Sequence, residues 1–280
     1  MQQMAVSANG INFTAFSVGE GPLVICLHGF PDTPHRFFPL MEQLAAAGYR
    51  VVAPYLRGYS PSSPAADGDY SVLALARDLL ALVEQLAPDG KAIVVGHDWG
   101  GFAAYTAANL QPERIRYLVQ LAIGHMAVSN LTLAQLRKSW YVWYFQLPWL
   151  PERKLPQDDF AFIEHLSRDW SPAYPFASAD FSLIKQTLSA EGGVHNALAY
   201  YRSMITGMGK EQWQLMSRPT TVPTLLVAGE LDGAIGLDQF RGIEKAYSGR
   251  FLFVSYPGVG HFPQLESPER LARDILEFVQ

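Results

Sequence analysis

The chain has 280 residues, of which 49% are hydrophobic and 17% charged, a composition typical of a globular protein that buries a sizeable core. Its net charge of -5 argues against nucleic-acid binding. We predict neither a signal peptide nor a membrane span, because no stretch reaches the roughly 20 apolar residues that a span needs. The single cysteine, Cys26, lies in an apolar run, which favours a buried thiol and a cytoplasmic location.

The first part of the chain alternates between predicted strands and helices. Short β-branched runs between glycines and prolines predict the strands, and apolar residues at helical spacing predict the helices. The expected strands are 11–18, 23–28, 50–56, 91–97 and 115–122, and the expected helices are 36–47, 71–86 and 102–109. This alternation predicts an α/β fold, with a mostly parallel central sheet flanked by helices.

The alternation stops after the strand at 115–122 and resumes near Val222. The residues between are rich in aromatics, prolines and helix-like periods. We therefore predict a helical cap at 125–217, inserted into a core made of 1–124 and 218–280. The core resumes with strands near 223–228 and 250–256 and helices near 236–247 and 267–279.

The segment from Lys91 to Gly101 carries the strongest chemical signal. A buried strand enters Gly96-His-Asp-Trp-Gly-Gly101, and a helix follows. Such a strand-to-helix turn is too tight for side chains beside its central residue, so glycine is required at both Gly96 and Gly100. The central residue of the turn is a nucleophile in hydrolases built this way, and here it is Asp98.

Later in the chain, Asp232 and His261 complete a catalytic set in the order nucleophile, acid, base. Asp232 follows an apolar strand, and His261 lies in the loop after the next strand. Both lie at the carboxyl end of a strand, where parallel sheets build their sites. Glu230 is a rival for the acid, whereas Glu266 is predicted to be a charge at a helix start.

The turn His28-Gly-Phe-Pro-Asp32 follows the second predicted strand and can face Asp98. We predict that the backbone N–H groups of Phe30 and Trp99 form an oxyanion hole. His28 is expected to bond loop backbone, because His261 already serves as the base. The Phe30–Pro31 bond is a candidate cis peptide.

Four motifs together resemble the epoxide hydrolase branch of the α/β-hydrolase superfamily, over nearly the whole chain. They are the segments 28–31, 57–60, 96–101 and 260–262. The resemblance implies an α/β-hydrolase fold and two cap tyrosines that hold an epoxide oxygen. The stretch 139–146 is similar to the first cap motif and indicates Tyr141, with Tyr144 as the alternative. The stretch 196–204 is similar to the second and indicates Tyr201.

A carboxylate nucleophile can open an epoxide by backside attack and form an alkyl ester, which His261 and Asp232 would hydrolyse through water to release a vicinal diol. The expected ligands are a small apolar epoxide and water. No metal or cofactor is expected, since the sequence lacks the corresponding motifs. Exposed cap aromatics could support a homodimer. A candidate substrate pocket consists of Trp140, Trp143, Tyr144 and Phe262.

Two alternative functions use the same sequence features. A haloalkane or haloacid dehalogenase would use the same Asp98, but haloalkane dehalogenases usually have asparagine where this chain has Phe30. A fluoroacetate-type enzyme typically has arginine where this chain has Trp99, and histidine and tryptophan in the first cap motif. A catalytically silent binding protein on this fold would have little reason to keep all three members of the catalytic set.

Overall fold

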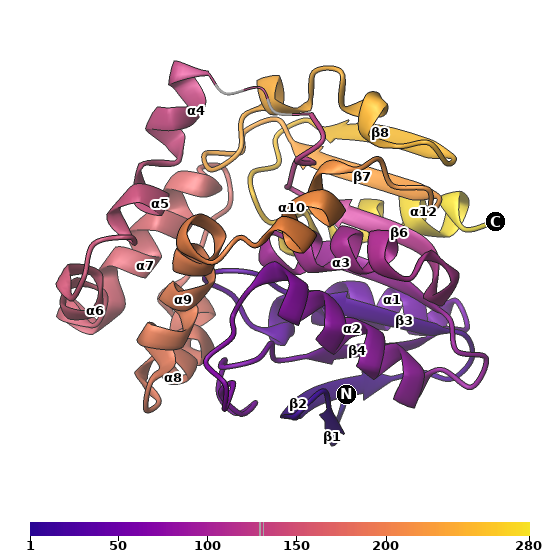
Figure 1. Cartoon of the computed structure of the whole chain (residues 1–280), viewed down its shortest axis with the longest axis horizontal. Coiled ribbons are helices and arrows are strands. Elements are labelled where there is room, and N and C mark those ends of the chain that lie inside the picture. The colour runs from indigo at the N-terminus through magenta and orange to yellow at the C-terminus, as the bar shows by residue number, and fades with distance from the viewer. Residues whose placement is uncertain (129, 131) are drawn as a thin grey trace.

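A single eight-stranded sheet runs through the computed structural model, which describes residues 1–128, 130 and 132–280 (Figure 1). The strands are β1 (Gln2–Ala8), β2 (Ile11–Val18), β3 (Leu23–Leu27), β4 (Arg50–Pro54), β5 (Ala92–His97), β6 (Ile115–Leu121), β7 (Thr224–Gly229) and β8 (Phe251–Tyr256). Their order in the sheet is β1-β2-β4-β3-β5-β6-β7-β8. The strand β2 runs antiparallel to β1 and β4, and every other pair of neighbouring strands is parallel. The mostly parallel α/β sheet predicted from the sequence is confirmed.

Helices cover both faces of the sheet. They are α1 (Phe38–Ala46), α2 (Val72–Leu86), α3 (Trp99–Leu110) and α12 (Pro268–Phe278). Successive residues of β3 point to opposite faces, as in any strand. Ile25 therefore lies in the apolar cluster with Leu79 of α2, whereas Cys26 lies in the cluster with Leu44 of α1 and Ile275 of α12. The central strands β3, β5 and β7 are buried along their whole length, and such strands are almost continuously apolar.

Between β6 and β7 the described residues form helices and no strand. We call residues 125–217 the helical insertion. Its helices are α4 (Leu133–Lys138), α5 (Trp140–Tyr144), α6 (Leu150–Lys154), α7 (Gln157–Trp170), α8 (Ser182–Ser189), α9 (Gly193–Thr206) and α10 (Lys210–Ser217). Helices α4 to α9 lie beside the sheet, at the left of Figure 1, while α10 packs against α3. No helix in the described ranges is long and apolar enough to cross a bilayer.

Two elements differ from the sequence-based predictions. The strand β1 was missed; it pairs with β2 through the turn Asn9-Gly10, where both residues have positive φ (47° and 76°), the backbone that a tight hairpin turn requires. The helix predicted at 236–247 is wrong. Two short 3₁₀ helices take its place, Leu237–Phe240 and Ile243–Ala246, and Gly242 between them has a left-handed φ of 71° that interrupts the helix.

Candidate active site

Asp98 occupies the sharp turn between β5 and α3 in a strained backbone conformation, with φ 50° and ψ -117°. A Cβ atom on Gly96 would lie 2.4 Å from the carbonyl oxygen of Gly100, and one on Gly100 would lie 2.2 Å from that of Leu27. The turn itself therefore excludes a side chain at Gly96, as the sequence predicted, whereas the end of β3 excludes one at Gly100. The turn also places the Asp98 carboxylate at the N-terminus of α3, where the helix dipole favours a negative charge.

Asp98 is buried beside backbone hydrogen-bond donors. The side chain is buried, and its Oδ1 accepts the N–H of Phe30 at 2.9 Å. Burial raises the pKa of Asp98, while the charge of His261 and the N–H groups of Phe30 and Trp99 act to lower it. Glycine is needed at position 29, because a Cβ there would lie 2.3 Å from Oδ1.

His261 and Asp232 form a buried pair beside Asp98. Nδ1 of His261 lies 2.9 Å from Oδ2 of Asp232, and Oδ1 of Asp232 accepts the N–H groups of Ala234 and Ile235. Nε2 of His261 lies 4.0 Å from Oδ2 of Asp98. Burial alone would lower the pKa of His261, but the charge and hydrogen bond of Asp232 outweigh it and the pKa is raised. The pair thus forms a base whose protonated state is stabilised.

Glu230 does not reach this pair. Its side chain is exposed, and its Oε1 accepts the hydroxyl of Ser255 at 2.8 Å. The loop after β7 therefore turns Asp232, and not Glu230, toward His261.

Tyr141 and Tyr201 come from α5 and α9 and meet in one buried cluster. They are 4% and 3% exposed, and their ring centroids lie 6.0 Å apart. The ring of Tyr201 also packs 4.9 Å from that of Trp99 and 5.3 Å from that of Phe30. Burial, followed by the charge of Asp98, raises the pKa of both tyrosines well above the usual range. Both phenols therefore keep their protons near neutral pH and can act as donors.

The aromatic residues predicted to line a pocket divide between the interior and the surface. Phe262 is fully buried, with its ring centroid 5.1 Å from that of His261. Trp140 and Trp143 are 46% and 56% exposed, because the helical turn of α5 that points Tyr141 inward points them away. Tyr144 is half-buried, and its hydroxyl donates to the carbonyl of residue 150. The structure does not bring Trp140, Trp143 or the Tyr144 hydroxyl to Asp98.

Trp170, at the end of α7, was not singled out from the sequence. It is buried, and its ring centroid lies 4.9 Å from that of Tyr141 and 5.0 Å from that of His261. Its position at the end of a helix in the middle of the insertion offered no motif by which it could be found.

Two expectations for the loop after β3 are confirmed. The Phe30–Pro31 peptide bond is cis. His28 bonds loop backbone through both ring nitrogens, with Nε2 accepting the N–H of Leu56 and Nδ1 2.9 Å from the carbonyl oxygen of Gly29. Burial lowers the pKa of His28 to about 4, so this histidine is neutral and structural.

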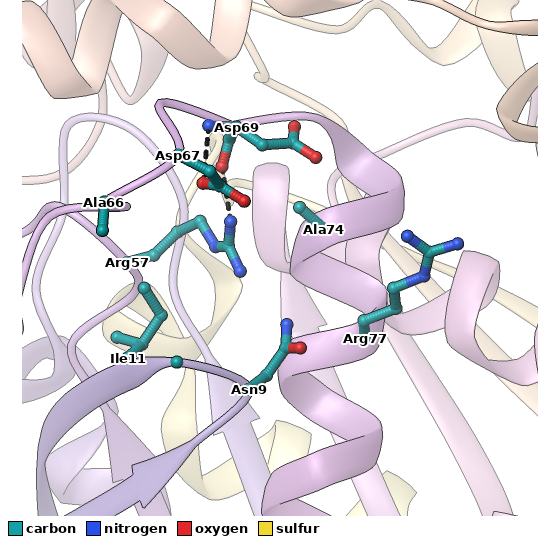
Figure 2. A pocket seen from close by; sticks show the side chains of 9 residues that line it. Asn9, Ile11, Arg57, Ala66, Asp67, Asp69, Ala74 and Arg77 are labelled. Atoms are coloured by element: carbon teal, nitrogen blue, oxygen red, sulfur yellow. Dashed lines mark hydrogen bonds between the residues drawn. The ribbon is translucent and has the colours of Figure 1, made fainter.

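A polar pocket of about 210 Å³ lies elsewhere, between the β1–β2 turn and α2 (Figure 2). None of the residues assigned above to the candidate site lines this pocket. Each of the three guanidinium nitrogens of Arg57 donates a hydrogen bond, two of them to the carboxylate oxygens of Asp78 and one to the carbonyl oxygen of Asp69. The pocket is therefore built around a structural ion pair. In the described ranges no three His, Cys, Asp or Glu side chains are grouped to hold a metal ion.

Comparison with known proteins agrees with this geometry. The alpha/beta hydrolase fold family matches residues 22–268. AB hydrolase superfamily protein YfhM of Bacillus subtilis (strain 168) is 32% identical over 98% of this chain and 96% of its own length, and Epoxide hydrolase 4 of Homo sapiens is 26% identical over 98% and 77%. The structure of a mutant epoxide hydrolase from Solanum tuberosum superposes with a TM-score of 0.83 at 27% identity, over 100% of this chain and 99% of that one.

The two relatives and the Solanum tuberosum structure match nearly all of the chain, and the family match spans the turn at Asp98 and the helical insertion. The protein is therefore a hydrolase of the α/β-hydrolase superfamily, and it belongs to the epoxide hydrolase branch.

Proposed function

We propose that the protein opens a small apolar epoxide to a vicinal diol. The observation that carries this proposal is the meeting of two buried, protonated tyrosines, Tyr141 and Tyr201, beside the carboxylate of Asp98. Two hydroxyl donors next to a carbon-attacking nucleophile suit an epoxide, whose oxygen needs protons as the ring opens. The names of Epoxide hydrolase 4 and of the Solanum tuberosum enzyme support the same substrate class.

In the first step, one carboxylate oxygen of Asp98 attacks an epoxide carbon and breaks its C–O bond. The product is an alkyl ester on Asp98, and the released oxygen takes a proton from one of the two phenols. Oδ1 accepts the N–H of Phe30, so we assign Oδ2, the oxygen 4.0 Å from His261, as the attacking atom. Oδ1 then becomes the carbonyl oxygen of the ester.

In the second step, Nε2 of His261 takes a proton from water, and the resulting hydroxide attacks the carbonyl carbon of the ester. Asp232 stabilises the imidazolium that forms. The N–H groups of Phe30 and Trp99 hold the oxyanion on Oδ1. Collapse of this intermediate breaks the ester C–O bond, and the departing alkoxide takes the proton of the hydroxyl added to Asp98, which releases the diol and restores the carboxylate. The proton held by His261 returns to the tyrosine that gave one up.

We also propose that residues 125–217 act as a cap on a catalytic core formed by 1–124 and 218–280. The insertion contributes Tyr141 and Tyr201, whereas Asp98, Asp232 and His261 come from loops that follow strands of the sheet. The core residues would thus form and hydrolyse the ester, and the cap residues would bind the epoxide oxygen.

A dehalogenase is the second candidate, and one observation favours it. Nε1 of Trp99 is buried and makes no hydrogen bond of ordinary geometry in the described ranges, although it lies near enough to the Tyr201 hydroxyl to act on the pKa of that tyrosine. The indole N–H could instead donate to a halide displaced by Asp98. The phenols of Tyr141 and Tyr201 have no corresponding role in halide release. We therefore rank epoxide opening first.

The two activities can be measured side by side. Purified protein is incubated with a panel of aryl, alicyclic and short alkyl epoxides and, in parallel, with haloalkanes and haloacids, while diol and halide are quantified. We expect diol from at least part of the epoxide panel and no halide above the Asp98→Ala control. Halide release without diol would establish the dehalogenase.

A further inference from the structure

The backbone N–H groups of Gly260, His261 and Phe262 all donate hydrogen bonds. Their acceptors are a group of neighbouring atoms on Glu266, Ser171 and Trp170. Gly260 and Phe262 donate to Oε2 and Oε1 of Glu266, at 2.7 and 2.9 Å. The N–H of His261 lies 2.9 Å from Oγ of Ser171 and 3.1 Å from the carbonyl oxygen of Trp170. Glu266 was predicted to be a charge at a helix start. It is instead the last residue of α11 (Pro263–Glu266), and its carboxylate folds back over the His261 loop.

Ser171 connects Glu266 to the helical insertion. Its buried hydroxyl donates to Oε1 of Glu266 at 2.6 Å while accepting the N–H of His261. A hydroxyl with one donor and two acceptor positions can make both bonds at once. Charge-assisted hydrogen bonds to a carboxylate are the stronger kind, so the Ser171–Glu266 contact fixes both partners.

The carbonyl oxygen of Trp170 ties the acid loop to the base loop. It accepts the N–H of His261 and that of Gly233, which follows Asp232, each at 3.1 Å. Each of these two loops has a glycine, Gly233 or Gly260, at the point where residues 169–171 of the insertion contact it. A Cβ on Gly233 would lie 2.1 Å from the carbonyl oxygen of Asp169, and one on Gly260 would lie 2.5 Å from Cα of Ser171. The chain at 169–171 is thus wedged between the two loops that carry Asp232 and His261.

We propose that Ser171 and Glu266 are positioning residues that lock the backbone of His261 to the helical insertion, so that hydrolysis of the ester depends on a contact with that insertion. The inference rests on the proposed function, in which His261 activates water. It assigns a role to two residues that do not touch the substrate.

The effect should fall on the second step alone. The attacking carboxylate of Asp98 is held by the Phe30 loop and by its own turn, and among the described residues the side chains of Ser171 and Glu266 hydrogen-bond each other and the His261 loop instead. The first step needs no base, since the carboxylate attacks directly. A base displaced by a fraction of an ångström loses its alignment with water, and misalignment of this size lowers rates strongly.

The first test compares two buried serines of α7 and its end. Ser171→Ala removes the bonds to His261 and Glu266, whereas Ser167→Ala removes only a bond to the carbonyl oxygen of Ile163. Rapid-quench mass spectrometry follows formation and decay of the Asp98 ester. We expect Ser171→Ala to slow decay about tenfold, the effect of losing one to two hydrogen bonds, and to leave formation within about twofold of the parent rate. Ser167→Ala should match the parent in both steps.

The second test uses charge. His261 is faced by the carboxylates of Asp232, Asp98, Glu266 and Asp32 and by the imidazole of His97. Glu266→Gln removes one negative charge near His261, so the pH at which ester decay loses half its rate should move to lower values. Glu269→Gln, at an exposed position of α12, should leave the pH at which decay loses half its rate unchanged. A purely structural weakening would slow decay at every pH without moving the profile.

Ser171→Thr retains a hydroxyl and should restore most of the decay rate, which keeps the test informative if Ser171→Ala is poorly folded; circular dichroism checks each variant. Ester decay at the parent rate in folded Ser171→Ala, with an unmoved profile in Glu266→Gln, would overturn the inference. Failure of the proposed function looks different, because the parent protein would then form no ester with any epoxide.

Discussion

The backbone N–H of Phe30 donates to Oδ1 of Asp98 at 2.9 Å, while Oδ2 faces Nε2 of His261 at 4.0 Å. The two oxygens of one carboxylate are thus distinguished by their surroundings. One is bound to the donor that we expect to hold an oxyanion, and the other faces the base. This asymmetry leads to four predictions about the order and the requirements of the two steps.

Replacing His261 with Gln should trap the ester. The base is lost, but Asp98 can still attack, so the intermediate forms and does not decay. Mass spectrometry after mixing with an epoxide that the parent hydrolyses should show the protein heavier by one substrate mass. Asp98→Ala should give neither adduct nor product. Normal turnover by His261→Gln without an adduct would show that His261 is not the base.

Asp232→Asn should slow ester decay far more than ester formation, because the lost charge stabilises protonated His261 and fixes the orientation of its ring. We expect a loss of about 10⁴-fold, the size seen when the acid of a comparable triad becomes an amide. Glu230→Gln is the matched control, since its carboxylate contacts Ser255 at the surface, and it should stay near the parent rate in single-turnover assays. The opposite ranking would identify Glu230 as the acid.

Tyr141→Phe and Tyr201→Phe should each slow formation of the ester. Either phenol can donate to the opening ring, so each single variant should lose about ten to a thousandfold and the double variant should be nearly inactive. Tyr144→Phe is the control within the same helix, because its hydroxyl bonds the carbonyl oxygen of Leu150. Ring opening at the parent rate by the double variant would remove the main argument against a dehalogenase.

The pH dependence of ester decay should reflect His261. Only neutral His261 can accept a proton, and its pKa is raised above the usual value of 6.5 by Asp232 against the opposing effect of burial. The charge of Asp98 also contributes to this shift and is absent in the ester, so Asp232 is the main remaining group that raises the pKa there. Decay should be fast above the pKa of His261 in the ester and be lost as the pH falls through it. Single-turnover measurements across pH would reveal the midpoint, and Asp232→Asn should move it downward.

The sequence alone determined the parts of this protein that depend on short-range sterics and on chain order. Gly96 is required by the turn itself, and Gly100 is required because the end of β3 packs against it. The two glycines flanking one residue nevertheless identified Asp98 from the sequence. The apolar strands fixed the α/β class, and the positions of Asp232 and His261 after later strands followed from it. The apolar spacing of 236–247 predicted one helix there, but it does not report the left-handed backbone of Gly242, which interrupts that helix.

Only the tertiary structure decided which side chains of the insertion face the site. The helix α5 reads Trp-Tyr-Val-Trp-Tyr, and because all five residues are apolar or aromatic, no polar position sets the phase of the helix. Packing against Trp170 and Tyr201 turns Tyr141 inward and leaves Trp140 and Trp143 at the surface. The contacts of Ser171 with His261 and Glu266 join residues 90 and 95 positions apart, and no local pattern specifies such contacts.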